Sequence, residues 1–437
     1  MRTRTAIIGG GFSGAMLAAR LAERGVASAL IERTGEFGPG VAYSSQFDRH
    51  LLNVRSSRMS AVEGRPDDFV RWLKAHHRRH ADADGFAPRR LYGSYVKDRL
   101  AAVEAAHPGL IERVTGEAAA IEASAVRLAD GRGIEAGAVV LTTGNPAPNV
   151  AGPSGGTGRI IDDPWAPAAL DRIGADDDVV ILGSGLTMVD MVLWLQAQGW
   201  RGKATALSRR GLKPREHGVG HDAPVPPTPA LTAGPLSARL AEGRRLAEQE
   251  GWRGVMEGLR PLTAGLWTSA DSATRARFLR HLRPWWDVHR HRLPPAIALT
   301  IEALEAAGRL EILAGRIGRL DETGDGVALD WRPRDGARRP RLAGRWLIDC
   351  SGPGHDPAAD PLIGPLIVSG RARLDALRLG LALDPSGRVL RADGAPDERL
   401  FVLGPPARGA FWETTAVPDI RSRIEDLATA LAGASSG

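Results

Sequence analysis

The sequence contains one cysteine, Cys350, so neither an intrachain disulfide framework nor a metal cluster of several thiolates can form. Aromatic residues make up only 5% of the 437 residues whereas glycine and alanine are plentiful, which favours an α/β fold over a β-sandwich. No apolar run is long enough to span a bilayer. The net charge of +6 comes from arginines spread along the chain, without a basic block interleaved with aromatics. The sequence therefore predicts no membrane and no nucleic-acid partner.

The length is enough for two or three domains with full cores. The stretch from Ala6 to Leu21, preceded by Arg2 and Arg4, could be mistaken for a signal peptide. Glycines crowd its supposed apolar core, and cleavage there would destroy a glycine turn, so we interpret it as a strand and a helix. This interpretation predicts a cytoplasmic protein.

A glycine-rich turn follows the first apolar run, Thr5 to Ile8, and opens a helical pattern that continues to about Arg24. The turn reads Gly9-Gly10-Gly11-Phe12-Ser13-Gly14, and Glu32 ends the next apolar run. Strand, G-x-G-x-x-G, helix, strand and acid form the pattern of a dinucleotide-binding unit. Gly9 permits the tight turn, Gly11 lets the backbone approach a pyrophosphate, and Gly14 lets helix and strand pack closely. The helix N-terminus offers free N–H groups to the phosphates.

The pattern recurs in the second half of the chain. The run Val179 to Leu182 leads into Gly183-Ser184-Gly185-Leu186-Thr187-Met188, in which methionine replaces the third glycine. Both copies continue with short antiparallel strand patterns and end in an apolar strand, at 139–144 and at 346–352. Two such units in one chain indicate that two dinucleotides meet.

The ends of the second strands indicate which dinucleotide each unit takes. Glu32 suits a free ribose 2′-hydroxyl and repels a phosphate, whereas Ser208, Arg209 and Arg210 suit a 2′-phosphate. The second unit is therefore predicted to bind NADPH in preference to NADH. The alternative is that residues 208–210 form a solvated strand end in an arginine-rich protein.

Several further segments resemble those of FAD/NAD(P)-binding flavoproteins with two dinucleotide-binding domains, allied to flavin-containing and N-hydroxylating monooxygenases. The resemblance covers nearly the whole chain and rests on residues 38–44, 50–54 with Met59-Ser60, 278–292, 403–409 and 412–421. It implies FAD in the first unit and a flavin covered by the segments at 38–60. The linker at 158–165 lacks the histidine of typical flavin-containing monooxygenases, which argues against that subgroup.

The predicted fold is α/β, with two three-layer Rossmann-like domains carrying β-meanders, and with an inserted helical region. Residues 1–170 and 353–437 form the expected FAD-binding domain, and residues 171–352 the NAD(P)H-binding domain, with the insert at about 225–307. The predicted FAD-binding residues are Gly9, Gly11, Phe12, Ser13, Gly14, Glu32, Arg33, Gly40, Tyr43, Asn53, Met59, Gly144, Gly404, Thr415, Ala416 and Val417. The predicted NADPH-binding residues are Gly183, Ser184, Gly185, Leu186, Thr187, Ser208, Arg209 and Arg210.

Within this set, Asn53 is the predicted catalytic residue, as a polar group near the reacting ring; the alternative is that it only fixes a loop. Tyr43 and Met59 are expected to form walls, with Tyr43 stacking on the cofactor. A helix beginning near Ala416 would aim its N–H groups at the flavin. The histidines and Asp287 of residues 281–291 have metal-like spacing, but we interpret them as packing residues and predict no metal.

No Ser-His-Asp arrangement, paired catalytic carboxylates or H-E-x-x-H motif can be picked out, which suits a flavoenzyme because the cofactor carries the reaction. The resemblance implies an FAD-dependent monooxygenase that uses NADPH and oxygenates a small nucleophile such as an amine. One alternative is an NAD(P)H:acceptor reductase on the same scaffold, and another is a non-enzymatic flavin-bearing redox sensor. The expected partner is a small-molecule substrate, and the sequence leaves room for a homo-oligomer.

Overall fold

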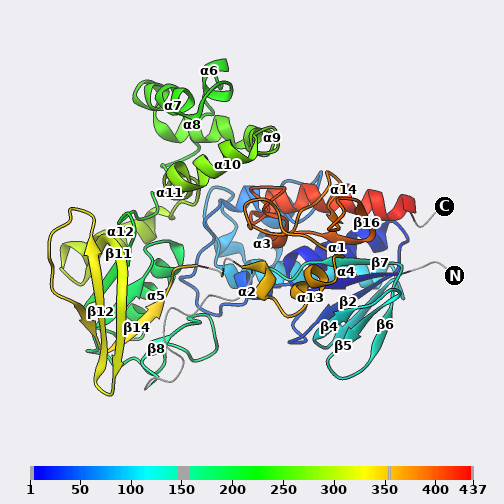
Figure 1. The fold of residues 1–437 in the computed structure, drawn as a ribbon, viewed down its shortest axis with the longest axis horizontal. Helices are drawn as coiled ribbons and strands as arrows, with labels where there is room; N and C mark the ends of the chain where they lie inside the picture. The colour runs from blue at the N-terminus through cyan, green and yellow to red at the C-terminus, as the bar shows by residue number, and fades with distance from the viewer. Residues whose placement is uncertain (1–3, 146–157, 353, 355, 435–437) are drawn as a thin grey trace.

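The computed structural model describes residues 4–145, 158–352, 354 and 356–434. Its first unit contains a six-stranded sheet in the order β15-β16-β7-β1-β2-β3 (Figure 1). The strands are β1 (Thr5–Ile8), β2 (Ser28–Glu32), β3 (Ile111–Thr115), β7 (Ala138–Leu141), β15 (Arg388–Leu390) and β16 (Pro396–Val402). All pair in parallel except β15 with β16. Both ends of the chain therefore build one sheet.

The two faces of this sheet carry separate apolar cores because strand side chains alternate between faces. In β1, Ile7 joins one core whereas Ala6 and Ile8 join the other. The first core holds α1 (Phe12–Glu23), α3 (Asp68–His76), α4 (Arg89–Ala106) and α14 (Val417–Ala434). The second holds α13 (Ile363–Val368) and a small antiparallel sheet of β4 (Ala118–Ile121), β5 (Ala125–Leu128) and β6 (Gly133–Glu135). The predicted three layers and the meander are both present.

The second unit contains a seven-stranded sheet in the order β13-β12-β11-β10-β9-β14-β8. The strands are β8 (Ile160–Ile161), β9 (Val179–Leu182), β10 (Ala204–Ser208), β11 (Leu310–Thr323), β12 (Gly326–Pro333), β13 (Leu342–Gly344) and β14 (Trp346–Asp349). Strands β8, β14, β9, β10 and the start of β11 are parallel, and β11 to β13 form an antiparallel meander. The helices α5 (Leu186–Ala197) and α12 (Pro295–Ala306) pack on one face.

Two predicted boundaries of the second unit are wrong. Strand β8 pairs with β14, and Leu170 lies in the core of the second unit, so the second unit begins before residue 171. Helix α12 also packs in this core through Ile301 and connects β10 to β11, as a crossover helix does, so it does not belong to the insert. In both cases the apolar faces are buried against the second sheet, a long-range contact that the sequence pattern does not display.

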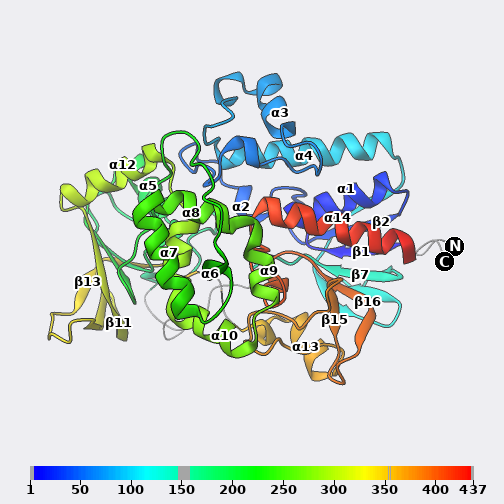
Figure 2. The same cartoon turned by 90° about the horizontal axis from the view of Figure 1, so that it is seen from above.

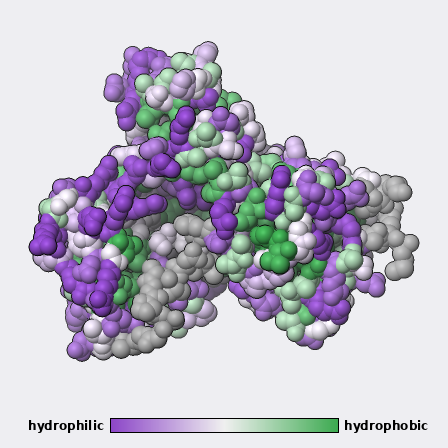
Figure 3. Space-filling view, viewed as in Figure 1, coloured by the Kyte–Doolittle hydropathy of each residue, from purple (hydrophilic) through white to green (hydrophobic). Residues whose placement is uncertain are grey.

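The remaining insert projects from the second unit and leans over the first, as two perpendicular views show (Figures 1 and 2). It contains α6 (Pro229–Thr232), α7 (Leu236–Glu250), α8 (Trp252–Leu259), α9 (Thr263–Thr268), α10 (Ser272–Arg277), a π-helical turn (Phe278–Leu282) and α11 (Arg283–Arg290). Its own core is small and centres on Leu231, Leu246 and Val255. The space-filling view shows a hollow between the two units beneath it (Figure 3). None of the helices in the described part of the chain combines the length and apolar character needed to cross a bilayer.

Candidate functional site

The first glycine turn has the close packing that its sequence predicts. Gly9 has a φ of 108°, and a Cβ there would overlap the carbonyl oxygen of Thr142. A Cβ on Gly14 would overlap the carbonyl oxygen of Gly9. Because both obstacles are backbone atoms that cannot swing aside, only glycine fits at these two positions.

Helix α1 begins with uncapped N–H groups. Its N-cap residue, Gly11, has no side chain to accept a hydrogen bond, and the first intrahelical backbone bond runs from Ala15 to Gly11. The N–H groups of Phe12, Ser13 and Gly14 therefore remain without a backbone acceptor among the described residues, which is the arrangement that binds a phosphate.

Glu32, at the end of β2, is already engaged in shaping this turn. Its Oε2 atom accepts a hydrogen bond from the Gly10 N–H at 2.8 Å, and Oε1 accepts from the Thr34 N–H and hydroxyl, each at 3.0 Å. The neighbouring Arg33 is exposed. Each carboxylate oxygen can accept more than one hydrogen bond, so Glu32 retains acceptor capacity for a ribose diol.

The predicted C-terminal residues meet this turn from the other end of the chain. Gly404 follows β16, and a Cβ on it would stand 3.0 Å from the Ser13 hydroxyl. The Thr414 hydroxyl donates to the Gly404 carbonyl oxygen at 2.8 Å. Gly144, with a φ of 76°, follows β7, the strand between β16 and β1. The carboxyl ends of four adjacent parallel strands thus gather these residues at one edge, and Thr415, Ala416 and Val417 lead into α14 there.

The segment after β2 closes over the turn. A Cβ on Gly11 would stand 3.3 Å from the Cα of Gly40, which begins the short helix α2 (Gly40–Tyr43). The Tyr43 ring packs edge-on against Phe12, at 6.4 Å between centroids, and against Tyr92, at 4.6 Å. Burial raises the pKa of Tyr43 to about 12, so its hydroxyl stays protonated.

Asn53 and Met59 lie in different surroundings. Met59 is 3% exposed and belongs to the first core, so the structure gives it a packing role. Asn53 lines a cavity rich in arginines, and its backbone carbonyl oxygen accepts a hydrogen bond from His217 Nε2 at 2.9 Å. The Asn53 side-chain amide makes no hydrogen bond to another described residue, so it is free to face a ligand.

The second glycine turn repeats the first with one change. Gly183 has a φ of 99°, and a Cβ there would overlap the carbonyl oxygen of Cys350, which follows β14 as Thr142 follows β7. Helix α5 also starts without a side-chain cap, since Gly185 is its N-cap, and Leu186 and Thr187 form its first turn. Met188, at the position where the first unit has Gly14, is fully buried in the core of the second unit.

The predicted 2′-phosphate residues lie beside this turn. The Ser184 hydroxyl donates to Leu212 O at 2.6 Å and lies 2.8 Å from the Ser208 hydroxyl, which accepts from the Gly211 N–H at 3.0 Å. Arg209 is exposed and makes no hydrogen bond or ion pair with another described residue. Arg210 donates to the Arg280 carbonyl oxygen at 3.1 Å. The structure therefore brings all three predicted residues to the edge beside Gly183.

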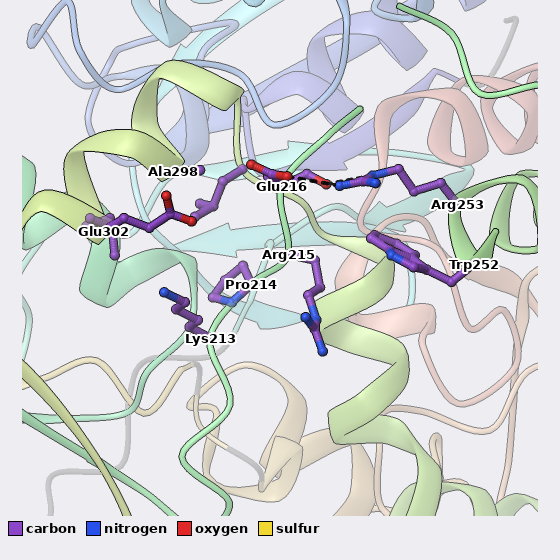
Figure 4. Close-up of a pocket in the computed structure, with 10 residues that line it drawn as sticks. Lys213, Pro214, Arg215, Glu216, Trp252, Arg253, Ala298 and Glu302 are labelled. Carbon is purple, nitrogen blue, oxygen red and sulfur yellow. Dashed lines mark hydrogen bonds and ion pairs between the residues drawn. The ribbon is translucent and has the colours of Figure 1, made fainter. Parts of the chain in front are cut away.

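Sequence reasoning missed a cavity of about 160 Å³ that begins at Lys213, shortly after Arg210 in the chain, and that three basic residues and two glutamates, Glu216 and Glu302, line (Figure 4). Lys213 and Arg215 line it, together with Trp252 of the insert, and Arg215 lies between the other two in this view. Glu216 and Arg253 form an ion pair at 3.2 Å across its rim. The sequence did contain an indication of this cavity, because basic residues continue past Arg210 at positions 213 and 215.

The two units are joined by a buried ion pair that the sequence did not reveal. Arg89 of the first unit lies 2.9 Å and 3.2 Å from the two carboxylate oxygens of Asp190, on α5. His50 Nε2–H donates to the Asp190 carbonyl oxygen at 3.0 Å, and His50 Nδ1 accepts from the Ser45 hydroxyl at 2.6 Å. Burial lowers the pKa of His50, which favours this neutral tautomer.

The insert is joined to the C-terminal segment through Glu413, another residue that the sequence patterns did not single out. Trp286 Nε1–H donates to Glu413 at 3.0 Å, and Arg290 forms an ion pair with it at 3.2 Å. The rings of Trp267 and Trp412 stack at 4.7 Å. Residues 278–292 thus contact the segment that leads into α14. Among the residues that the structure describes, no group of histidine, cysteine and carboxylate side chains could hold a metal ion.

Comparisons with known proteins agree with this architecture. Residues 6–146 match a family model described as FAD-NAD(P)-binding. No curated protein sequence matches the chain.

Solved structures with the same fold include three monooxygenases of similar length. Cadaverine monooxygenase from Erwinia amylovora, bound to FAD, is 13% identical with a TM-score of 0.69, covering 99% of this chain and 95% of its own. L-lysine 6-monooxygenase from Pseudomonas syringae is 16% identical with a TM-score of 0.63, covering 100% of both chains. Ornithine N-hydroxylase from Kutzneria sp. 744, with reduced FAD, NADP⁺ and L-ornithine, is 15% identical with a TM-score of 0.62, covering 99% of both. At these identities the likeness confirms the predicted α/β fold with two Rossmann-like domains.

Proposed function

We propose that this protein binds FAD in the first unit and NADPH in the second, and uses them to oxygenate a small nucleophilic substrate. The observation that carries the proposal is the pair of matching cradles, in which Gly9 abuts Thr142 and Gly183 abuts Cys350. Each cradle places an uncapped helix N-terminus at the carboxyl edge of a parallel sheet. The FAD-NAD(P)-binding family model over residues 6–146 supports the same assignment.

The residues present fit these two coenzymes. In the first cradle, Glu32 would accept from the adenosine ribose, the first-turn N–H groups of α1 would hold the pyrophosphate, and the start of α14 would face the flavin. In the second, Arg209 would hold the 2′-phosphate and α5 the pyrophosphate. When bound, the flavin supplies the redox chemistry, accepting electrons from NADPH and activating oxygen. The chain's own task is to orient the two coenzymes and to exclude water.

The closure of the second unit on the first supports a meeting of the two coenzymes. Arg89 and Asp190 join the units near the start of α5, beside the second cradle. The flavin monooxygenases with this fold cover nearly the whole chain and act on amines by name, which supports an oxygenated small molecule as the product. A cytoplasmic location is part of the proposal, supported by the formation of β1 and α1 by residues 6–21.

A dithiol relay, as in disulfide reductases, finds no support. Cys350 is the sole cysteine of the chain, and burial raises the pKa of its thiol well above the usual range. An inert buried thiol cannot pass electrons to a substrate disulfide.

The test begins with purified protein, reconstituted with FAD and reduced by NADPH without oxygen. Mixing with oxygen should give a transient flavin spectrum before the oxidised spectrum returns, with little peroxide when substrate is present. Direct reoxidation with stoichiometric peroxide would identify an acceptor reductase instead. Very slow reduction with every acceptor would identify a redox sensor, and a preparation that takes up no flavin would refute the proposal.

A further inference from the structure

A second cavity lies where the Asn53 segment, residues 217–222 and the insert meet. Its volume is about 30 Å³, which suits a carboxylate-sized group and not a whole coenzyme. Five arginines line it, namely Arg55, Arg58, Arg260, Arg290 and Arg292. Only two carboxylates do, Glu257 and Asp222.

Some of this positive charge is balanced nearby. Glu257 lies 2.6 Å from Arg58, 3.4 Å from Arg292 and 3.6 Å from Arg260. Arg292 also lies 3.6 Å from Asp222.

Arg290 and Arg55 also have oxygen partners. Arg290 pairs with Glu413 at 3.2 Å and lies 3.9 Å from Asp419, and Arg55 binds backbone carbonyl oxygens, including that of Gly218 at 2.8 Å. Five guanidinium groups thus face four carboxylates, so the cluster carries excess positive charge.

Two arginines also keep unused hydrogen-bond donors. The Arg290 side chain is only 8% exposed, and its Nε is buried without a hydrogen-bond partner among the described residues, whereas its Nη2 forms the ion pairs with Glu413 and Asp419. The Arg260 side chain, which is 21% exposed, makes no hydrogen bond to another described residue and lies 3.6 Å from Glu257. Burial and the like charges of Arg290 and Arg58 lower the pKa of Arg260 to about 10. A buried donor without an acceptor is costly, so an anion would satisfy the Arg290 Nε and would also offset the excess positive charge.

We infer that this cavity is an anion subsite, in which Arg260 and Arg290 bind a carboxylate or phosphate group of the substrate. The inference rests on the proposed function, and it names the substrate class as a small acidic molecule. A diamine is disfavoured, because its ammonium groups would enter a cluster of like charge. His217, which also lines the cavity, adds no charge near neutral pH, since burial lowers its pKa to about 4.

The phosphate groups of the two coenzymes are another source of anions that arginines bind. Residues 208–210 do not line this cavity, and neither do the first-turn residues of α1 or α5. Ligand binding in the cavity should therefore be additive with NADP⁺ binding.

The test is calorimetric titration of FAD-loaded protein with succinate, inorganic phosphate and cadaverine, with and without saturating NADP⁺, at low ionic strength. We expect at least one of the two anions to bind, no binding of cadaverine, and no effect of NADP⁺. Arg260→Gln should weaken anion binding about tenfold or more, and Arg260→Lys less. Arg58→Gln, at the cavity rim, gives a second variant should Arg260→Gln fold poorly. Arg244→Gln, an exposed arginine of α7 outside the cavity, is the matched control and should change nothing.

The inference is overturned if neither anion binds, if cadaverine binds more tightly, if Arg260→Gln and Arg58→Gln bind as the parent does, or if NADP⁺ abolishes binding. Flavin content and reduction by NADPH are measured on the same samples. Normal reduction without anion binding refutes the subsite alone. Arginine-dependent anion binding in a protein that NADPH does not reduce refutes the proposed function and leaves the subsite standing.

Discussion

Replacing Arg209 with alanine should weaken the binding of NADPH and spare that of NADH. Arg209 follows β10, is exposed, and makes no hydrogen bond or ion pair within the described structure. Its removal therefore takes nothing from the fold, and the change in stability should stay within about 0.5 kcal/mol. Any effect on coenzyme binding then reports a contact with the coenzyme itself.

The expected loss of NADPH affinity depends on which of the three candidate residues already make hydrogen bonds within the protein. Ser208 already accepts from the Gly211 N–H, and Arg210 donates to the Arg280 carbonyl oxygen. Arg209 makes no such bond to a described residue, so it should contribute most to binding the 2′-phosphate. A charge-assisted hydrogen bond contributes about 1.5–3 kcal/mol, and the exposure of Arg209 favours the lower end, which is about tenfold in Kd.

The assay is the anaerobic rate of flavin reduction as a function of coenzyme concentration, measured for NADPH and NADH. Arg209→Lys should recover part of the affinity, because it keeps the charge but loses the forked geometry. Arg201→Ala removes an exposed arginine paired with Asp176 at 2.7 Å and serves as the control. Equal losses for both coenzymes, or an unchanged NADPH affinity, would refute the assignment of the 2′-phosphate site.

Three further predictions concern the frame of the site. Gly14→Ala should abolish flavin uptake, measured by absorbance, because its Cβ would overlap the Gly9 carbonyl oxygen; normal uptake would contradict the tight turn. Arg89→Ala should destabilise the protein by about 3–5 kcal/mol in urea unfolding, because it leaves the Asp190 carboxylate buried and unpaired, and a loss below about 1 kcal/mol would contradict this. His217 has a pKa of about 4 in the folded protein and 6.5 as a free side chain, so the unfolded chain binds the proton first and stability falls as the pH drops through this window. That loss, roughly 3 kcal/mol, should be missing from the pH profile of His217→Gln, and identical profiles would show that His217 is not responsible.

The glycine turns were predictable because their chemistry is local. Strand, turn and helix follow one another within about twenty residues, and the demand for a residue without a Cβ at Gly9 and Gly14 is visible in the sequence itself. The convergence of Gly404 on Ser13 was predictable only through the family resemblance, because 391 residues separate them (404 − 13).

The contacts that hold the units and the insert together could not be predicted in the same way. Arg89 and Asp190 lie in unrelated helical patterns, and either could equally have faced solvent. Glu413 pairs with Trp286 and Arg290 only because the insert leans over the C-terminal segment, which depends on packing between elements distant in sequence. The prediction that α12 belongs to the insert was wrong for the same reason, since the pattern of an amphipathic helix does not show which apolar surface the helix covers.

Two differences between the glycine turns bear on how the proposed coenzymes are held. In the first unit Gly11 approaches Gly40 so closely that a Cβ would stand 3.3 Å from the neighbouring Cα, and the Gly40 segment closes the cradle. In the second, a Cβ on Gly185 would meet no atom within 4 Å, and Met188 replaces the third glycine. A closed cradle suits a coenzyme that stays through many turnovers, and an open one suits a coenzyme that must leave after each. The geometry thus favours FAD that stays bound in the first unit and NADPH that exchanges in the second. The charges of Glu32 and Arg209 select which coenzyme each unit binds, but they do not by themselves account for this difference in exchange.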